Sequence, residues 1–227
     1  MRIVSKLWAP LILLFLSLPP QAWAFAYSAE AIEGWVVDAE THEPLEGVNV
    51  VAHWALLVGD HGLQTDLMLM ESVTDKDGRY YFPAWGPEPI PAGLPLGARL
   101  QNLDPGIVFF KSGYGRQAVS NEIKGPDLDF GLPVRTSNWN QKTIEFKKSR
   151  WPFDQYGLVV SGVLNGVSWG GCGWKKIPRM MVALNREAER LSQQHAFHTV
   201  PSFRQIENTA EGKNCGSVQA FFRDYLK

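Results

Sequence analysis

The ten residues from Val73 to Phe82, VTDKDGRYYF, constrain the fold more than any other stretch of this sequence. The central Asp-Lys-Asp-Gly run combines side chains that hydrogen-bond to the backbone with a glycine that tolerates a positive φ, as a hairpin turn requires. The flanking residues are rich in β-branched and aromatic side chains, which favour strands. The segment therefore predicts a β-hairpin and favours a β-sandwich.

Other strand-like runs lie on both sides of this hairpin. The clearest cover residues 32–38, 48–54, 107–111 and 143–147, and a less regular run covers residues 63–73. Turn sequences separate these runs, and no strand–helix–strand rhythm argues for a parallel sheet. This pattern predicts a mainly β protein built on an antiparallel β-sandwich.

Three strings in this region, GWVVDAETHEPLEGVNVVA, VTDKDGRYYF and VFFKSGY, together resemble the carboxypeptidase regulatory-like domain, a transthyretin-like fold. The residues that carry the resemblance are Gly34, Val36 or Val37, Asp38, Pro44, Leu45, Gly47, Val48, Thr74, Asp75, Gly78, Tyr80, Phe82, Gly113 and Tyr114. The resemblance covers roughly residues 30–148. It implies a seven-stranded sandwich that acts as a non-catalytic module for stability, anchoring or recognition.

The chain departs from this family in two long connections. The proline-rich insert between Phe82 and Ile107 is expected to form an extended surface loop rather than additional sheet. A second long connection runs from Tyr114 to Trp139. The related hydroxyisourate hydrolases share the architecture, but their C-terminal Tyr-Arg-Gly-Ser signature is not found in this chain.

The first 24 residues have the organisation of a secretory signal. Arg2 and Lys6 precede an apolar run from Leu11 to Leu18, and Ala22–Ala24 fits the small-x-small cleavage rule. Cleavage would start the mature chain near Phe25, and an uncleaved signal would be the only contact with a membrane. We therefore divide the chain into a signal peptide (1–24), a β-sandwich (25–149) and a C-terminal extension (150–227), exported to the periplasm or the exterior of a Gram-negative bacterium.

The extension is expected to be helical. Pro178 suits a first helical position, and apolar residues recur at helical spacing from Met180 to Leu191. A shorter helix is expected from Pro201, and Ser217 is a plausible N-cap for a last one. The stretch from Trp151 to Val163 still reads as β-like.

Cys172 and Cys215 are the only cysteines. An even pair in an exported chain predicts a disulfide bond. The alternative is a hydrolase in which Cys172 is the nucleophile and His195 or His198 its base. That His pair lacks a third ligand for zinc, so we expect no metal site and no other cofactor.

Composition leaves the partner open. The formal net charge of −1 gives no basic excess for nucleic acid, so the expected partner is another protein or a cell-surface glycan. Loops on a rigid sandwich often carry binding residues, although a loop tryptophan can equally serve as a packing plug. The candidates for a recognition surface are Trp85, Trp139, Trp151, Trp169 and Trp174.

Overall fold

The computed structural model describes residues 26–58, 63–95, 97–101, 103–122, 133–194, 199–209 and 214–227. The expected signal peptide and the His195–His198 segment lie outside these residues. No helix of the described residues is long and apolar enough to cross a membrane.

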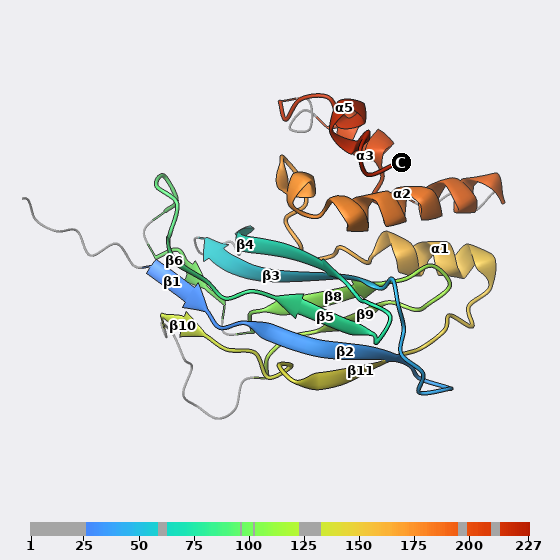
Figure 1. Cartoon of the computed structure of the whole chain (residues 1–227). Coiled ribbons are helices and arrows are strands. Elements are labelled where there is room, and N and C mark those ends of the chain that lie inside the picture. Colours follow the sequence, from blue (N-terminus) through green and yellow to red (C-terminus); the bar gives the residue numbers. More distant parts are fainter. Residues whose placement is uncertain are drawn as a thin grey trace, which may run out of the picture.

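The described chain is mainly β, and all of its strands precede its helices (Figure 1). The strands are β1 (Ala26–Ala29), β2 (Ile32–Asp38), β3 (Asn49–Val58), β4 (Leu63–Val73), β5 (Arg79–Phe82), β6 (Trp85–Pro89), β7 (Arg99–Leu100), β8 (Gly106–Phe110), β9 (Gln117–Val119), β10 (Val134–Arg135) and β11 (Lys142–Phe146). The helices are α1 (Phe153–Ser161), the 3₁₀ helix η1 (Gly173–Lys176), α2 (Pro178–Gln193), α3 (Phe203–Asn208) and α5 (Val218–Phe222).

The strands form three sheets, with the orders β10–β1–β6, β11–β2–β5 and β4–β3–β8–β9, and β7 pairs with β3. The first two sheets follow each other along the chain, since two residues separate β1 from β2 and two separate β5 from β6. Tyr27, Val36 and Phe82 from these two sheets share one core with Trp54 and Phe109 of the third. The strands thus form a sandwich of two layers.

A third layer of helices covers the other face of the β4–β3–β8–β9 sheet (Figure 1). The alternation along β3 places Val50, Ala52 and Trp54 in the sandwich core, whereas Val51 faces the helices. On the helical side, Val51 packs in a second core with Trp174 and residues of α1, α2 and α5. The amphipathic helices therefore bury their apolar faces on the sandwich.

One acidic side chain of the sheet fixes the start of α2. The Glu71 carboxylate of β4 accepts backbone N–H bonds from Arg179 (3.0 Å) and Met180 (2.5 Å). These amides belong to the first turn of α2, where no intrahelical acceptor is available. Helix α2 is thus capped by the strand beneath it.

Several sequence predictions are wrong in detail. The segment Val73–Phe82 is not a β-hairpin, because β4 and β5 belong to different sheets and do not pair with each other. The sandwich, which has eleven strands in the described residues, is not wholly antiparallel, because β10 pairs with β1 and β11 with β2 in parallel. The proline-rich insert is not only a loop, since it contributes β6 and β7. The β-like stretch after Trp151 forms helix α1, because Tyr156 and Val160 are buried in the helical core.

Candidate ligand-binding site

The five candidate tryptophans do not form one surface. Trp174 is fully buried beneath α5, with its ring 5.1 Å from Phe221 and 5.4 Å from Phe222. Trp85 is 7% exposed and packs edge-on against Trp54 in the sandwich. For these two residues the expected recognition role is wrong, because a ligand cannot reach them.

The other three candidates differ in exposure. Trp139 packs partly against the sandwich core, and its indole N–H donates to the Ser120 carbonyl at 2.7 Å. Trp169 packs partly against the helical core. Trp151 is 59% exposed and lies in the connection between β11 and α1. Of the five, Trp151 offers the most ring surface to a ligand.

Trp151 lies on the wall of a surface hollow of about 510 Å³, which we call the Trp151 hollow. Its lining residues are Ala39, Glu40, Gly115, Arg116, Lys147, Lys148, Ser149, Arg150 and Trp151. Three chain segments meet here because the Gly115 N–H donates to the Lys147 carbonyl at 2.9 Å, and the Ala39 N–H donates to the Phe146 carbonyl at 3.0 Å.

Asp38 fixes the geometry of this hollow. Its carboxylate accepts the Tyr114 hydroxyl at 2.7 Å and the backbone N–H groups of Glu40 (2.9 Å) and Thr41 (3.2 Å). The Lys148 ammonium lies 3.2 Å from the same carboxylate. The hydrogen bond from Tyr114, followed by that from the Glu40 amide, holds the pKa of Asp38 well below its usual range. The carboxylate therefore stays charged and ties all three segments together.

The hollow carries an excess of positive charge. Arg150 pairs with Glu40 at 2.6 Å, and Lys148 pairs with Asp38. Arg116 and Lys147 are exposed and form no ion pair with any residue of the described chain. Four cationic and two acidic groups leave a surplus of two positive charges, on a chain whose formal net charge is −1.

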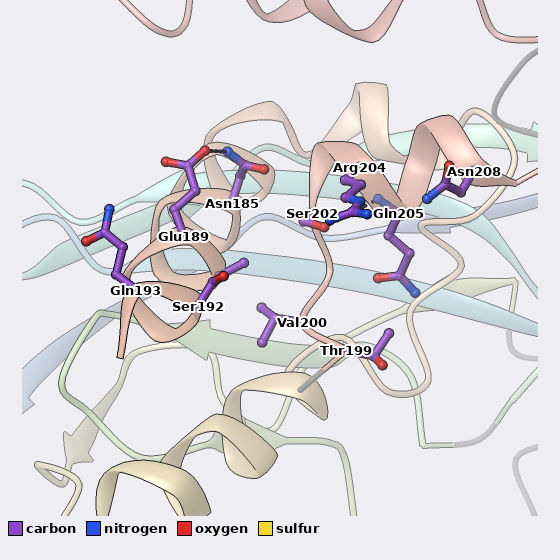
Figure 2. Close-up of a pocket in the computed structure, with 11 residues that line it drawn as sticks. Asn185, Glu189, Ser192, Gln193, Thr199, Val200, Ser202, Arg204, Gln205 and Asn208 are labelled. Carbon is purple, nitrogen blue, oxygen red and sulfur yellow. Dashed lines mark hydrogen bonds between the residues drawn. The ribbon is translucent and has the colours of Figure 1, made fainter. Parts of the chain in front are cut away.

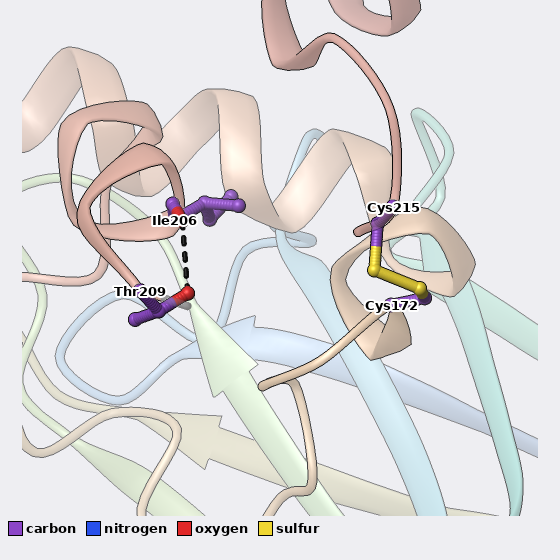
Figure 3. The surroundings of a disulfide bond; sticks show 4 residues. All are labelled: Cys172, Ile206, Thr209 and Cys215. Atoms are coloured by element: carbon purple, nitrogen blue, oxygen red, sulfur yellow. Dashed lines mark hydrogen bonds between the residues drawn. A yellow bond between two sulfur atoms is a disulfide. The ribbon is translucent and has the colours of Figure 1, made fainter. Parts of the chain in front are cut away.

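The disulfide between Cys172 and Cys215 is confirmed, with the two Cα atoms 5.5 Å apart (Figure 3). It joins the turn before η1 to the residues before α5. A sulfur in this bond cannot be a thiolate nucleophile, so the alternative of a hydrolase based on Cys172 is wrong. Its proposed bases, His195 and His198, lie outside the described residues.

A second hollow, of about 800 Å³, lies between α2 and α3 (Figure 2). Its walls are mostly polar, and two of the polar side chains, Asn185 and Glu189, are hydrogen-bonded to each other. The Asn185 amide donates to Glu189 at 2.8 Å, and its oxygen accepts the Phe203 N–H at 3.0 Å. Among the described residues, no three His, Cys, Asp or Glu side chains are placed to hold a metal ion.

The positive charges of the Trp151 hollow are visible in the sequence only in part. The run Lys147–Trp151, KKSRW, combines three cations with an aromatic residue. Arg116 and Glu40 lie far from this run in sequence, and only the sheet pairing brings them to it. The sequence signal for this site is therefore a cluster of basic and aromatic residues that follows a predicted strand.

Comparison with known proteins does not identify a family. No family model and no curated protein matches this chain. The dioxygenase domain of a dioxygenase carbohydrate-binding protein fusion from Streptomyces sp. SirexAA-E is 16% identical, with 56% of this chain and 82% of that chain covered and a TM-score of 0.28. Catechol 1,2-dioxygenase from Acinetobacter sp. ADP1 is 17% identical over 56% of this chain and 54% of that chain, with a TM-score of 0.29. The major plantain pollen allergen Pla l 1 is 17% identical, with 53% of this chain and 94% of that chain covered and a TM-score of 0.26.

Proposed function

We propose that this protein is an exported binding module of the bacterial cell envelope, and that its Trp151 hollow binds an acidic polysaccharide. The single observation that carries the proposal is a tryptophan 59% exposed in a hollow with four cationic side chains. The indole face offers apolar area for a sugar ring. Guanidinium and ammonium groups beside it offer charge-assisted hydrogen bonds to carboxylate or sulfate groups.

A polysaccharide suits this site better than a protein partner. The hollow of about 510 Å³ has the size of a small-ligand pocket, which typically measures roughly 300–1,000 Å³. A stable protein interface usually buries more than about 1,000 Å² and centres on apolar anchors. Here one exposed ring is surrounded by charge, an arrangement that suits an anionic chain of sugar units.

Export is supported by two observations of different kinds. The first 24 residues have the organisation of a secretory signal, and the Cys172–Cys215 bond is typical of an oxidising compartment. Together they favour the periplasm or the cell exterior over the cytosol.

We also propose that the strand region is a carboxypeptidase regulatory-like, transthyretin-like sandwich. Its sequence motifs contact one another in space, which supports a common structural role. The Thr74 hydroxyl donates to the Leu45 carbonyl at 2.6 Å and accepts the Val48 N–H at 2.8 Å, joining the turn between β4 and β5 to the Pro-Leu-x-Gly-Val turn. The Tyr114–Asp38 hydrogen bond joins the two remaining motifs.

The test is calorimetric titration of the mature protein with an oligogalacturonate, using maltohexaose as the uncharged control ligand. We expect binding of the acidic oligosaccharide alone, weakened by added salt because exposed charges are screened. Trp151→Ala and the double change Arg116→Ala/Lys147→Ala should each weaken binding at least about tenfold, equivalent to about 1.4 kcal/mol.

Two matched controls accompany these variants. Leu158 is 64% exposed on α1, outside the hollow, and Lys142 is an exposed cation of β11. Leu158→Ala and Lys142→Ala should bind like the wild type. Equal affinity of wild type and Trp151→Ala for oligogalacturonate would overturn the proposal, and so would equal binding of both oligosaccharides.

A further inference from the structure

A second polar centre lies near the other end of β8, far along the strand from the Trp151 hollow. The His53 imidazole, in the middle of the apolar strand β3, places Nδ1 3.0 Å from the Asp66 carboxylate of β4. The second oxygen of Asp66 accepts the Ser168 N–H at 2.6 Å. Both side chains are largely buried, with exposed fractions of 13% and 3%. The carboxylate therefore holds the imidazole in one orientation.

A β-bulge brings this pair together. In the β3–β4 ladder Trp54 pairs with Met68 and Ala55 with Asp66, so Leu67 is the extra residue. Without that insertion, the two-residue periodicity of the strand would turn Asp66 to the opposite face of the sheet from His53. Bulges are common where a strand must redirect a functional side chain.

His53 extends over a neighbouring glycine towards the next strand. His53 pairs with Gly106 of β8, and a Cβ atom on Gly106 would lie 2.3 Å from the His53 Nε2 atom. In the β8–β9 ladder Ile107 pairs with Val119, so the register extended by one residue sets Ser120 beside Gly106. His53, Gly106 and Ser120 line the same pocket of about 170 Å³.

The row Asp66–His53–Gly106–Ser120 thus crosses four neighbouring strands on one face of the sheet. With strands about 4.8 Å apart, the Cα atoms of His53 and Ser120 are separated by roughly 10 Å. This distance suits an imidazole and a hydroxyl that reach towards each other over a residue without a side chain. Ser120 is exposed, so a substrate can reach its hydroxyl.

Two further polar groups line the pocket. The side-chain amide nitrogen of Gln101 is buried and has no hydrogen-bond partner among the described residues. Asp104 is 4% exposed, and although Arg135 Nη2 lies 3.1 Å from Oδ1, neither carboxylate oxygen accepts a well-formed hydrogen bond within the described chain. Burial raises the pKa of Asp104 to about 7, against the opposing effect of Arg135.

We propose that Ser120, His53 and Asp66 form a nucleophilic triad that hydrolyses a small acyl ester in this pocket. This activity goes beyond glycan binding and departs from the expectation of a non-catalytic module. The proposal rests on the row of side chains, not on the Trp151 hollow, so the two fail independently.

Each residue of the triad has its own role in the reaction. The Ser120 hydroxyl oxygen attacks the ester carbonyl carbon, and its proton passes to His53 Nε2. His53 then gives that proton to the departing alcohol oxygen, leaving an acyl group on Ser120. A water molecule, deprotonated by His53, attacks the acyl carbon, and the proton returns to the Ser120 oxygen as the carboxylic acid leaves. The Gln101 amide is a donor available to the oxyanion of both tetrahedral intermediates.

A fluorophosphonate and p-nitrophenyl acetate are the probes that test the triad. We expect the fluorophosphonate to label wild-type protein at Ser120, as located by peptide mass mapping, and to leave Ser120→Ala unlabelled. Hydrolysis of p-nitrophenyl acetate should fall about 10²- to 10⁴-fold in His53→Gln, the usual contribution of a general base. Ser192→Ala, which changes an exposed serine on α2, is the matched control and should keep both activities.

Two variants separate a catalytic triad from a structural His–Asp pair. The charged groups around the His53 ring are Asp66 of β4, Asp104 before β8 and, beyond Asp104, Arg135 of β10. Asp66→Asn should lower kcat for ester hydrolysis rather than raise KM, whereas a purely structural pair would leave both constants unchanged. Ser120→Ala should lose the activity and melt at the same temperature as the wild type. Absence of label at Ser120, or equal ester hydrolysis by wild type and Ser120→Ala, would overturn the proposal.

Discussion

The Tyr114 hydroxyl donates a 2.7 Å hydrogen bond to the Asp38 carboxylate, across 76 residues of sequence. Asp38 ends β2, and Tyr114 follows β8, so the bond joins the two layers of the sandwich. Burial and the neighbouring Asp38 charge together raise the pKa of Tyr114 to about 12. The phenol therefore remains a donor at every physiological pH and holds the edge of the Trp151 hollow in place.

Removal of this hydroxyl should destabilise the protein. We expect Tyr114→Phe to lower the free energy of unfolding by about 1 kcal/mol at pH 7, a typical value for one lost hydrogen bond. Because the pKa of Asp38 is lower in the folded than in the unfolded state, the charged bond stabilises above about pH 4 and its contribution fades as the pH falls below that value. Urea unfolding of both proteins at pH 7 and pH 3 measures this. A difference that grows towards pH 3 would contradict the account.

The disulfide should stabilise mainly the helical layer. It closes a separation of 43 residues, for which the chain-entropy estimate is roughly 4 kcal/mol. The variant Cys172→Ala/Cys215→Ala should therefore unfold at lower urea concentration. Hydrogen exchange should show the loss of protection around η1 and α5 rather than in β3. Unchanged stability of the double variant would refute this role.

Two tryptophans provide a contrast between packing and exposure. Trp174 is fully buried, whereas Trp151 is 59% exposed. Trp174→Ala should cost about 3–5 kcal/mol, as expected for a large side chain removed from a core. Trp151→Ala should change stability by less than about 0.5 kcal/mol. Thermal unfolding of the two variants checks both values, and a large destabilisation by Trp151→Ala would mean that this ring packs rather than binds.

The cap that Glu71 gives to α2 should be measurable. Glu71→Ala leaves the Arg179 and Met180 amides without their acceptor and should cost about 1–2 kcal/mol, the usual value of a lost helix cap. Glu145→Ala removes an exposed carboxylate of β11 and serves as the control, because surface charges contribute little. Equal denaturation midpoints for the two variants would contradict the capping role.

Local sequence patterns predict the strands well where a run is long. The range expected for residues 32–38 coincides with β2. The turn expected within Val73–Phe82 forms and connects β4 to β5, but the two strands belong to different sheets and do not pair as a hairpin. The strands of the proline-rich insert are harder to predict, because Pro87 and Pro89 disfavour a strand. They are tolerated in β6 because this strand lies at a sheet edge and pairs only with β1.

Tertiary contacts explain the remaining errors. The stretch GLVVSGVL is rich in valine and glycine and has no helical preference of its own. It is helical because a helix buries Val160 in the core between the helices and the sheet. Likewise, no local pattern places Arg116 beside Lys147 or Ser120 beside His53. Both neighbourhoods arise from pairing between strands that are distant in sequence.

Binding of an acidic polysaccharide at Trp151 is tested by an NMR titration of the mature protein, in which the indole N–H signals of its tryptophans are followed as oligogalacturonate is added. We expect a saturable shift of the Trp151 indole signal, with the signals of the buried Trp54 and Trp174 unchanged. Maltohexaose should leave all of these signals in place. A Trp151 signal that stays unchanged while the oligosaccharide binds elsewhere, or does not bind, would contradict the assignment of this hollow as the binding site.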